Sequence, residues 1–278
     1  MIRWAHGTWM LASRALAAVA LVACLSAAAP AVAQDAATDL QWDARWHRAD
    51  FTDYLLIGAL TWAGLTAEFA LIPDLARWRG GILMDDWIHE NLSLRDPIAR
   101  EVADTVSDIL QWVALSWPIA VDTILIPWVI ERNADVGWQL FTINSISVAS
   151  TLALSFFIKN LIARERPFAR NCRVDPQWDF ECEQPERNRS FYSGHTAFAV
   201  TAAGLICMHH DRLPLYGGVR DRIACYSAIG VATTVGLLRI LADKHYFTDV
   251  FVGAVAGIVS GVLLPWFLRY GFDDRPFE

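Results

Sequence analysis

Long apolar runs separated by short polar segments dominate this chain. Four runs approach the roughly 20 residues that a membrane-spanning helix needs; they cover residues 109–130, 138–158, 223–241 and 250–268. A run over 54–72 is only marginally long enough to span, and a run over 197–208 extends one more helix from the polar loop before it. The pattern predicts an all-α, multi-pass membrane bundle of about six helices.

The first residues have the pattern of a targeting segment. Arg3 and Arg14 precede an apolar stretch that ends in the small-residue cleavage site Ala-Val-Ala at Ala33. We therefore predict a signal peptide over residues 1–33. A lipoprotein signal that ends at Cys24 and an uncleaved anchor are the alternatives.

The rest of the chain divides by composition into three parts. Residues 34–104 are expected to form an N-terminal helix followed by an interfacial segment with a short amphipathic helix. Trp42 and Trp46 in this part are interpreted as anchors at the membrane interface. Residues 105–270 hold the stronger apolar runs and are expected to form the helical bundle, and residues 271–278 a short tail.

Composition agrees with the pattern and narrows the possible partners. Of the 278 residues, 55% are hydrophobic and 19% are charged, which is typical of a membrane protein rather than of a water-soluble one. The formal net charge of -7 gives no reason to expect nucleic-acid binding. The predicted partners are therefore membrane lipids.

Two polar clusters follow one another at helix ends. Lys159 and Arg166 are seven residues apart, two helical turns, so they can share one face. Ser193 and Gly194 begin the next helix, where exposed backbone N–H groups form a ready anion site. His195 stands in the first turn of that helix, where it can give a proton to a leaving oxygen.

A third cluster joins the last two apolar runs. Asp249 follows His245 by four residues, so on a helix its carboxylate can fix the tautomer and orientation of the imidazole. Arg239 brings a permanent charge in a geometry suited to phosphate. Counting the helices places all three clusters at one membrane face. The sequence therefore predicts a single site for phosphoryl transfer.

These clusters resemble the three-part signature of the type 2 phosphatidic acid phosphatase and vanadium haloperoxidase superfamily. That signature is Lys, six residues, Arg-Pro; then Pro-Ser-Gly-His; then Ser-Arg, five residues, His, three residues, Asp. The stretch from Lys159 to Pro167 matches fully, whereas Tyr192 replaces the Pro of the second part and Leu238 the Ser of the third. The resemblance covers about residues 105–270, and both departures fall at supporting positions.

The resemblance implies a membrane phosphatase that hydrolyses a lipid phosphate monoester or diphosphate, with no metal and no cofactor. It implies that His245 is the nucleophile and forms a phosphohistidine, that Asp249 orients it, and that His195 protonates the leaving alcohol. The phosphate oxygens are then held by Lys159, Arg166, Ser193, Gly194 and Arg239. A lipid phosphotransferase, a vanadate-dependent haloperoxidase and a non-catalytic membrane scaffold are the alternatives.

The cysteines and the basic residues bear on which side the site faces. Cys172 and Cys182 lie in the polar loop between the first two clusters, and we expect a disulfide if that loop is outside the cytoplasm. Cys207 and Cys225 lie in apolar runs and are expected to be buried thiols. A cleaved signal followed by six full spans instead places the active face inside, as does the Lys/Arg distribution. We predict the periplasmic face of a bacterial inner membrane, because the disulfide and the family pattern favour it.

Several other polar residues are interpreted as structural rather than catalytic or metal-binding. Asp122 lies within a span, where an acid is a functional hypothesis, but a carboxylate bonded between helices is the favoured interpretation. His209 and His210 are interpreted as marking the far membrane interface rather than a metal site. Asp85 and Asp86 are interpreted as helix caps rather than cation ligands.

Overall fold

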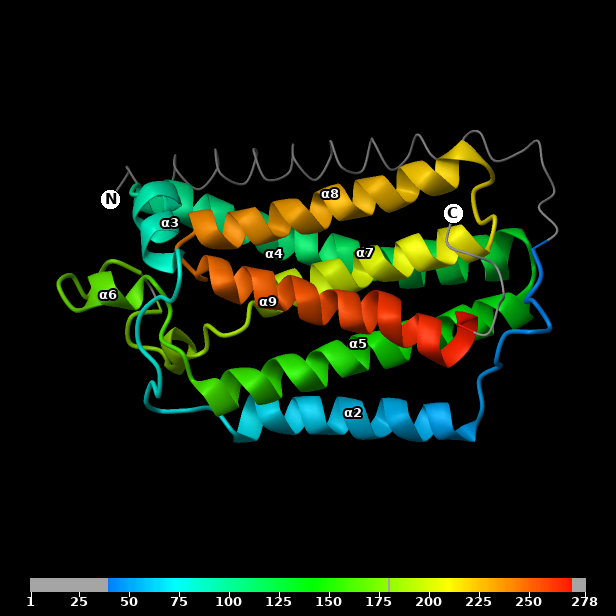
Figure 1. Ribbon diagram of the computed structural model, residues 1–278, viewed down its shortest axis with the longest axis horizontal. Coiled ribbons are helices and arrows are strands. Elements are labelled where there is room, and N and C mark those ends of the chain that lie inside the picture. The colour runs from blue at the N-terminus through cyan, green and yellow to red at the C-terminus, as the bar shows by residue number, and fades with distance from the viewer. Residues whose placement is uncertain (1–39, 180, 272–278) are drawn as a thin grey trace, which may run out of the picture.

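The computed structural model describes residues 40–179 and 181–271, and within them helices pack side by side along one axis (Figure 1). Four are long and apolar enough to cross a membrane: Pro97–Ile130, Ala134–Ile162, Val219–Leu241 and Phe247–Tyr270. The long helices are α2 (Phe51–Ala70), α4 (Pro97–Ile119) continued by η2 (Ala120–Ile130), α5 (Ala134–Ile162), α7 (Gly194–Arg212), α8 (Val219–Leu241) and α9 (Phe247–Ile258) continued by η4 (Val259–Leu263) and η5 (Trp266–Tyr270). The predicted all-α membrane bundle of about six helices is confirmed.

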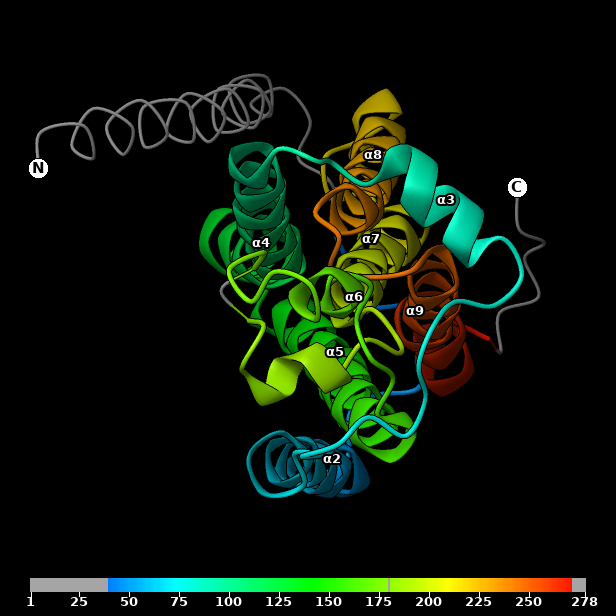
Figure 2. The same ribbon diagram turned by 90° about the vertical axis from the view of Figure 1, so that its left-hand side faces the viewer.

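Shorter elements gather at one end of the bundle, on the left of Figure 1 and facing the viewer in Figure 2. They include α3 (Asp85–Leu92) and α6 (Ala169–Cys172). The connection between α5 and α7, which contains α6, also contains the single turn η3 (Pro185–Asn188). The short helix expected within residues 34–104 corresponds to α3. Because α4 begins at Pro97, the boundary that composition placed at residue 104 falls inside a helix.

Helix α7 lies in the middle of the bundle, with α4, α5, α8 and α9 around it, and α2 packs outside against α5 (Figure 2). Small residues let α9 approach α7 closely. A Cβ at Gly257 would lie 2.7 Å from the carbonyl oxygen of Ala197, and one at Gly261 would lie still closer to the backbone of Thr201. Close backbone approach at small residues is how helices pack in membranes, where no hydrophobic effect drives them together.

The outward faces of these helices carry large apolar side chains. In water such a surface would mark an interaction site or an aggregation hazard, whereas in a bilayer it meets lipid chains. The exposed aromatic residues on it include Trp62, Phe69, Trp112, Phe157, Tyr226, Phe251 and Phe267.

Trp42 and Trp46 are not interface anchors, and that interpretation is wrong. Both are buried, and the ring of Trp46 meets the ring of Tyr270 edge-on with centroids 5.0 Å apart. Segment 40–50 lies at the end of the bundle opposite α3 and α6 (Figure 1), where its indoles join an apolar cluster with residues such as Leu140. Spacing alone could not distinguish an indole at a lipid interface from one in this core.

The described part of the chain contains two disulfide bonds, in different regions of the bundle. Cys172 is bonded to Cys182 across a separation of ten residues in the loop before α7. Cys207 is bonded to Cys225, which contradicts the prediction that both stay thiols. That prediction treated two apolar runs separately, whereas α7 and α8 form an antiparallel hairpin that brings the two Cα atoms to 4.5 Å. This second bridge lies toward the hairpin turn, at the far end from α6.

Buried polar residues tie the helices together at that far end. The hydroxyl of Tyr216 donates to Asp122 at 2.5 Å, and the ring of His210 bonds to Asp221 at 2.6 Å. The two ring nitrogens of His209 bond to the side chain of Asn144 and to the hydroxyl of Tyr270. Asp122 is thus bonded to the turn between α7 and α8, and it lies 3.4 Å from Nε2 of His210 on α7, which agrees with its interpretation as a structural carboxylate. His209 and His210 lie in the last turn of α7, at the expected end of the bundle, and both are buried.

Candidate active site

The three clusters meet at the end of the bundle where α3 and α6 lie (Figure 1). This follows from chain direction, because α5 and α8 end at this face whereas α7 and α9 begin there. The last turns of α5 and α8 supply Lys159 and Arg239. The connection before α7 supplies Arg166, and the turn between α8 and α9 supplies His245. Each predicted site residue therefore lies at this one end.

His245 is buried, and neither of its ring nitrogens has a hydrogen-bond partner among the described residues. A buried polar group without a partner is costly, so it marks a place where a ligand can bind. Burial, together with the charges of Arg166, Arg239 and Lys159, holds the pKa of His245 well below its ordinary value. The imidazole is therefore neutral at neutral pH, which is the form that can attack phosphorus.

Asp249 has a different local geometry from the one the spacing predicts. His245 stands before the first turn of α9, so the two residues do not share a helical face, and Nδ1 of His245 lies 3.8 Å from Oδ2 of Asp249. That distance is too long for a hydrogen bond. The carboxylate instead accepts from the backbone N–H of Tyr246 at 3.0 Å and from the hydroxyl of Ser190 at 2.5 Å. Its role in orienting His245 stays a prediction.

Arg164 holds Asp249 and the interfacial segment together. Its fully buried guanidinium donates to Oδ1 of Asp249 at 2.5 Å and to Oδ2 of Asp85 at 2.7 Å, and it lies between the rings of Trp78 and Tyr246. Burial alone would raise the pKa of Asp85, but Arg164 and neighbouring donors outweigh it and lower the pKa. Asp85 is thus a charged partner of Arg164, in addition to accepting from the backbone N–H of Thr248 at the start of α9.

Gly194 gives Lys159 room. A Cβ at Gly194 would lie 2.8 Å from Nζ of Lys159, closer than real contacts allow, so a larger residue here would displace the ammonium from its present place at the start of α7. The hydroxyl oxygen of Ser193 caps the helix by accepting from the backbone N–H of Thr196 at 3.4 Å, and it also accepts from the hydroxyl of Thr196 at 2.9 Å. The Ser193 hydroxyl proton is still available to a phosphate oxygen.

A carboxylate-bearing loop contacts the cations of the site from one side. Arg166 Nη1 lies 2.8 Å from Oε2 of Glu181, and Lys244 Nζ lies 3.0 Å from Oδ1 of Asp179. Burial alone would raise the pKa of Glu181, but Arg166 and Lys244 outweigh it and lower the pKa, so the group is ionised. Lys244 was missed in the sequence, although it directly precedes His245, because no motif position marks it.

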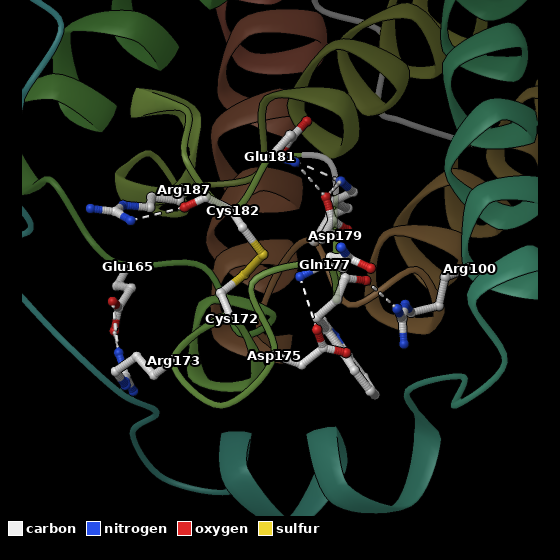
Figure 3. The surroundings of a disulfide bond; sticks show 12 residues. Arg100, Glu165, Cys172, Arg173, Asp175, Gln177, Asp179, Glu181, Cys182 and Arg187 are labelled. Carbon is white, nitrogen blue, oxygen red and sulfur yellow. Dashed lines mark hydrogen bonds and ion pairs between the residues drawn. A yellow bond between two sulfur atoms is a disulfide. The ribbon is translucent and has the colours of Figure 1, made fainter.

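The disulfide Cys172–Cys182 closes this loop (Figure 3). Arg100, at the start of α4, holds it from outside: the guanidinium lies 4.0 Å above the ring of Trp178 and donates to the carbonyl oxygen of that residue at 2.7 Å. Asp179 and Glu181 are therefore kept against the cations by both a covalent and a polar constraint.

Helix α4 contacts the site from the other side. Arg239 pairs with Asp104, donates to the hydroxyl of Ser107 at 3.1 Å and lies 3.3 Å from Oδ1 of Asp108. The same oxygen of Asp108 lies 2.7 Å from Nε2 of His195. No pattern in the sequence marks these acids as part of the site, because they are more than 130 residues from Arg239.

Taken together, a neutral buried imidazole lies among fixed cations that are neutralised by carboxylates. Positioning and charge stabilisation are what phosphoryl transfer requires of a protein. Arg166 contacts Glu181 through Nη1, and its buried Nε has no hydrogen-bond partner among the described residues, so the guanidinium keeps a donor for a phosphate oxygen.

Parts of this chain are similar to known proteins. Residues 141–273 match the model of the PAP2 superfamily. Over 86 residues, 31% of this chain, the sequence is 36% identical to "Lipid A 1-phosphatase" of Porphyromonas gingivalis, and the match covers 18% of that relative's length. The fold is similar to a solved transmembrane PAP2-type phosphatidylglycerolphosphate phosphatase from Bacillus subtilis, with a TM-score of 0.50 and 18% identity, over 78% of this chain and 96% of that one.

The matched region contains every motif residue from Lys159 to Asp249, so the family match and the three-part signature point to the same part of the chain. The apolar helices and the similar transmembrane fold agree with it. This chain is an integral membrane protein whose residues 141–273 match the model of the PAP2 superfamily.

Proposed function

We propose that this chain is a membrane phosphatase that hydrolyses a lipid phosphate monoester or diphosphate through a phosphohistidine on His245. The observation that carries the proposal is the buried, neutral and unpartnered imidazole of His245 among the charges of Lys159, Arg166 and Arg239. The exposed apolar faces of the helices supply the surface along which a lipid chain lies while its phosphate enters the polar end. The matched relative is itself named for a lipid phosphate.

The reaction has two displacements at phosphorus. In the first, Nε2 of His245 attacks, the bond from phosphorus to the lipid oxygen breaks, and His195 gives a proton to that oxygen. In the second, water attacks the phosphohistidine, its proton passes to His195, and inorganic phosphate leaves. Lys159, Arg166 and Arg239 bind the equatorial oxygens, on which the transition-state charge is spread.

The alternative enzymes differ from a phosphatase in what they do with the group bound in the anion pocket. A lipid phosphotransferase passes the phosphoryl group to a second headgroup instead of to water, and a haloperoxidase uses the same anion pocket to hold vanadate. A scaffold needs no reactive group, so the complete set of motif residues favours an enzyme. Product analysis separates all of these.

We expect the detergent-purified protein to release inorganic phosphate from phosphatidic acid in the presence of EDTA and to be inhibited by orthovanadate. Vanadate adopts the trigonal bipyramidal geometry of the transition state at a site of this kind, and cations of the protein rather than metal ions bind the oxygens. Phosphate release is measured by a colorimetric assay with each addition. Loss of activity on chelation that a divalent ion restores, or transfer to an added alcohol without free phosphate, contradicts the proposal.

The proposal also places the active face on the periplasmic side of a bacterial inner membrane. Segment 40–50 lies at the opposite end of the bundle, and α2 runs from there along α5 toward the active end (Figure 1). A periplasmic site therefore puts segment 40–50 on the cytoplasmic side. On this proposal residues 1–33, which lie outside the described residues, are not translocated, and the predicted cleavage after Ala33 does not occur.

Labelling of cysteines tests this orientation. In intact spheroplasts, we expect a membrane-impermeant maleimide to modify Cys172 and Cys182 only after treatment with an impermeant reductant, because their bridge lies in the outer loop. Peptide mass spectrometry identifies the modified residues. Labelling without reductant excludes the bridge, and labelling that requires lysis places the active face in the cytoplasm.

A further inference from the structure

Asp108 contacts the reaction machinery although it belongs to none of the three motif parts. It lies on α4, with its Oδ1 2.7 Å from Nε2 of His195 and 3.3 Å from Nη1 of Arg239. Its side chain is 50% exposed, whereas that of Asp104, one turn earlier, is 15% exposed and is paired with Arg239. Asp108 is therefore the carboxylate that is both bonded to His195 and free to move toward solvent.

His195 needs such a partner. To protonate a leaving alkoxide it must carry a proton before the lipid oxygen departs. Burial, together with the charges of Arg239 from α8, Lys159 from α5 and Arg166 from the loop before α7, holds the pKa of His195 well below its ordinary value, and Asp104 and Asp108 from α4 oppose this shift. Asp249, the acid of the third motif, is bonded to Arg164 and Ser190 and serves another part of the site.

We propose that Asp108 is a positioning residue that stabilises the protonated form of His195 and directs Nε2 toward the leaving oxygen. The inference rests on the proposed function. When the phosphate ester enters, its bridging oxygen replaces the carboxylate as the acceptor at Nε2. As the bond from phosphorus to that oxygen breaks, the proton moves from Nε2 to the oxygen, and Asp108 turns toward solvent. After water has returned a proton to His195, the carboxylate binds it again.

The test is the pH profile of Asp108→Asn on phosphatidic acid. Removing the carboxylate makes the imidazolium lose its proton at lower pH, and activity requires that proton. The alkaline limb of kcat/KM is therefore expected to move to lower pH by about one unit. At neutral pH we expect roughly a tenfold loss, which is smaller than the 10²–10⁴-fold that general acid catalysis as a whole contributes, because His195 itself remains. Asp108→Glu restores the limb, and Glu101→Gln, an exposed acid on the same helix, leaves it unchanged.

A second substrate separates positioning from a merely structural role. An aryl phosphate such as p-nitrophenyl phosphate has a leaving group that departs without a proton, so Asp108→Asn and His195→Ala are both expected to retain its first displacement, measured as a burst of p-nitrophenolate. In the His195→Ala background, Asp108→Asn should have no further effect on lipid hydrolysis, because the two residues act as a unit.

Two outcomes overturn the inference. One is an equal loss on both substrates with an unmoved alkaline limb, and the other is an additive loss in the double variant. If the proposed function itself is wrong, His245→Ala keeps full activity on the lipid. If only the role of Asp108 is wrong, His245→Ala is inactive and Asp108→Asn has the same pH profile as the parent protein.

Discussion

His245→Ala is expected to lower phosphate release by more than about 10³-fold, because the variant lacks the nucleophile and retains only the binding groups. Folding should be little affected, since neither ring nitrogen of His245 has a hydrogen-bond partner within the described residues. Initial rates on phosphatidic acid, together with the elution profile and melting temperature in detergent, test both parts. Asp249→Asn is expected to lose less activity, because the imidazole remains.

A buried histidine at the other end of the bundle provides the matched control. His209 bonds to Asn144 and Tyr270, so His209→Ala leaves buried polar groups unpaired and should lower the melting temperature while the remaining folded protein keeps its specific activity. Normal turnover of a stable His245→Ala protein contradicts the assignment of the nucleophile.

Arg164→Ala is expected to destabilise the folded protein by about 3–5 kcal/mol, the usual cost of removing one partner from a buried ion pair. The substitution leaves the carboxylates of Asp85 and Asp249 buried without their shared cation. Activity should fall as well, because Asp249 then has no fixed place beside His245. Arg164→Lys keeps the charge but cannot bridge both acids in the same way, so its effect should be intermediate.

An exposed arginine from the same connection provides the comparison. Arg173 pairs with Glu165 with 54% of its side chain exposed, and Arg173→Ala should change stability by at most about 1 kcal/mol. Thermal unfolding in detergent compares the two variants. Equal melting temperatures for Arg164→Ala and the parent protein contradict the role of Arg164 as the centre of this network.

Helices and motif residues could be predicted from the sequence because both are recorded locally. The length of an apolar run reports a span, and spacings such as that from Lys159 to Arg166 report one part of a site. The direction of successive helices then brings those parts to one face. The family model matched residues 141–273, a region that already contained the three parts of the signature.

The contacts between these parts could not be predicted, because no local pattern records them. Arg164 and Asp85 are 79 residues apart, and nothing near either residue specifies the other. The bridge between Cys207 and Cys225 depends on the register of a helical hairpin, which apolar periodicity leaves open. The turn at His245 shows the same limit on a smaller scale: a spacing of four residues indicates a helical pair only where both residues lie within the helix.

The two disulfides lie at opposite ends of a bundle that crosses a membrane, Cys172–Cys182 in the loop at the active end and Cys207–Cys225 toward the turn between α7 and α8. If the active face points outward, the first disulfide lies on the oxidising periplasmic side and the second lies toward the reducing cytoplasm. The loop that carries Asp179 and Glu181 is then locked in an oxidising environment. On the proposed orientation, the joint between α7 and α8 lies on the side where cellular thiols exchange with disulfides. Cytoplasmic reductants would then loosen the hairpin of the central helix while the bridge in the catalytic loop stays closed.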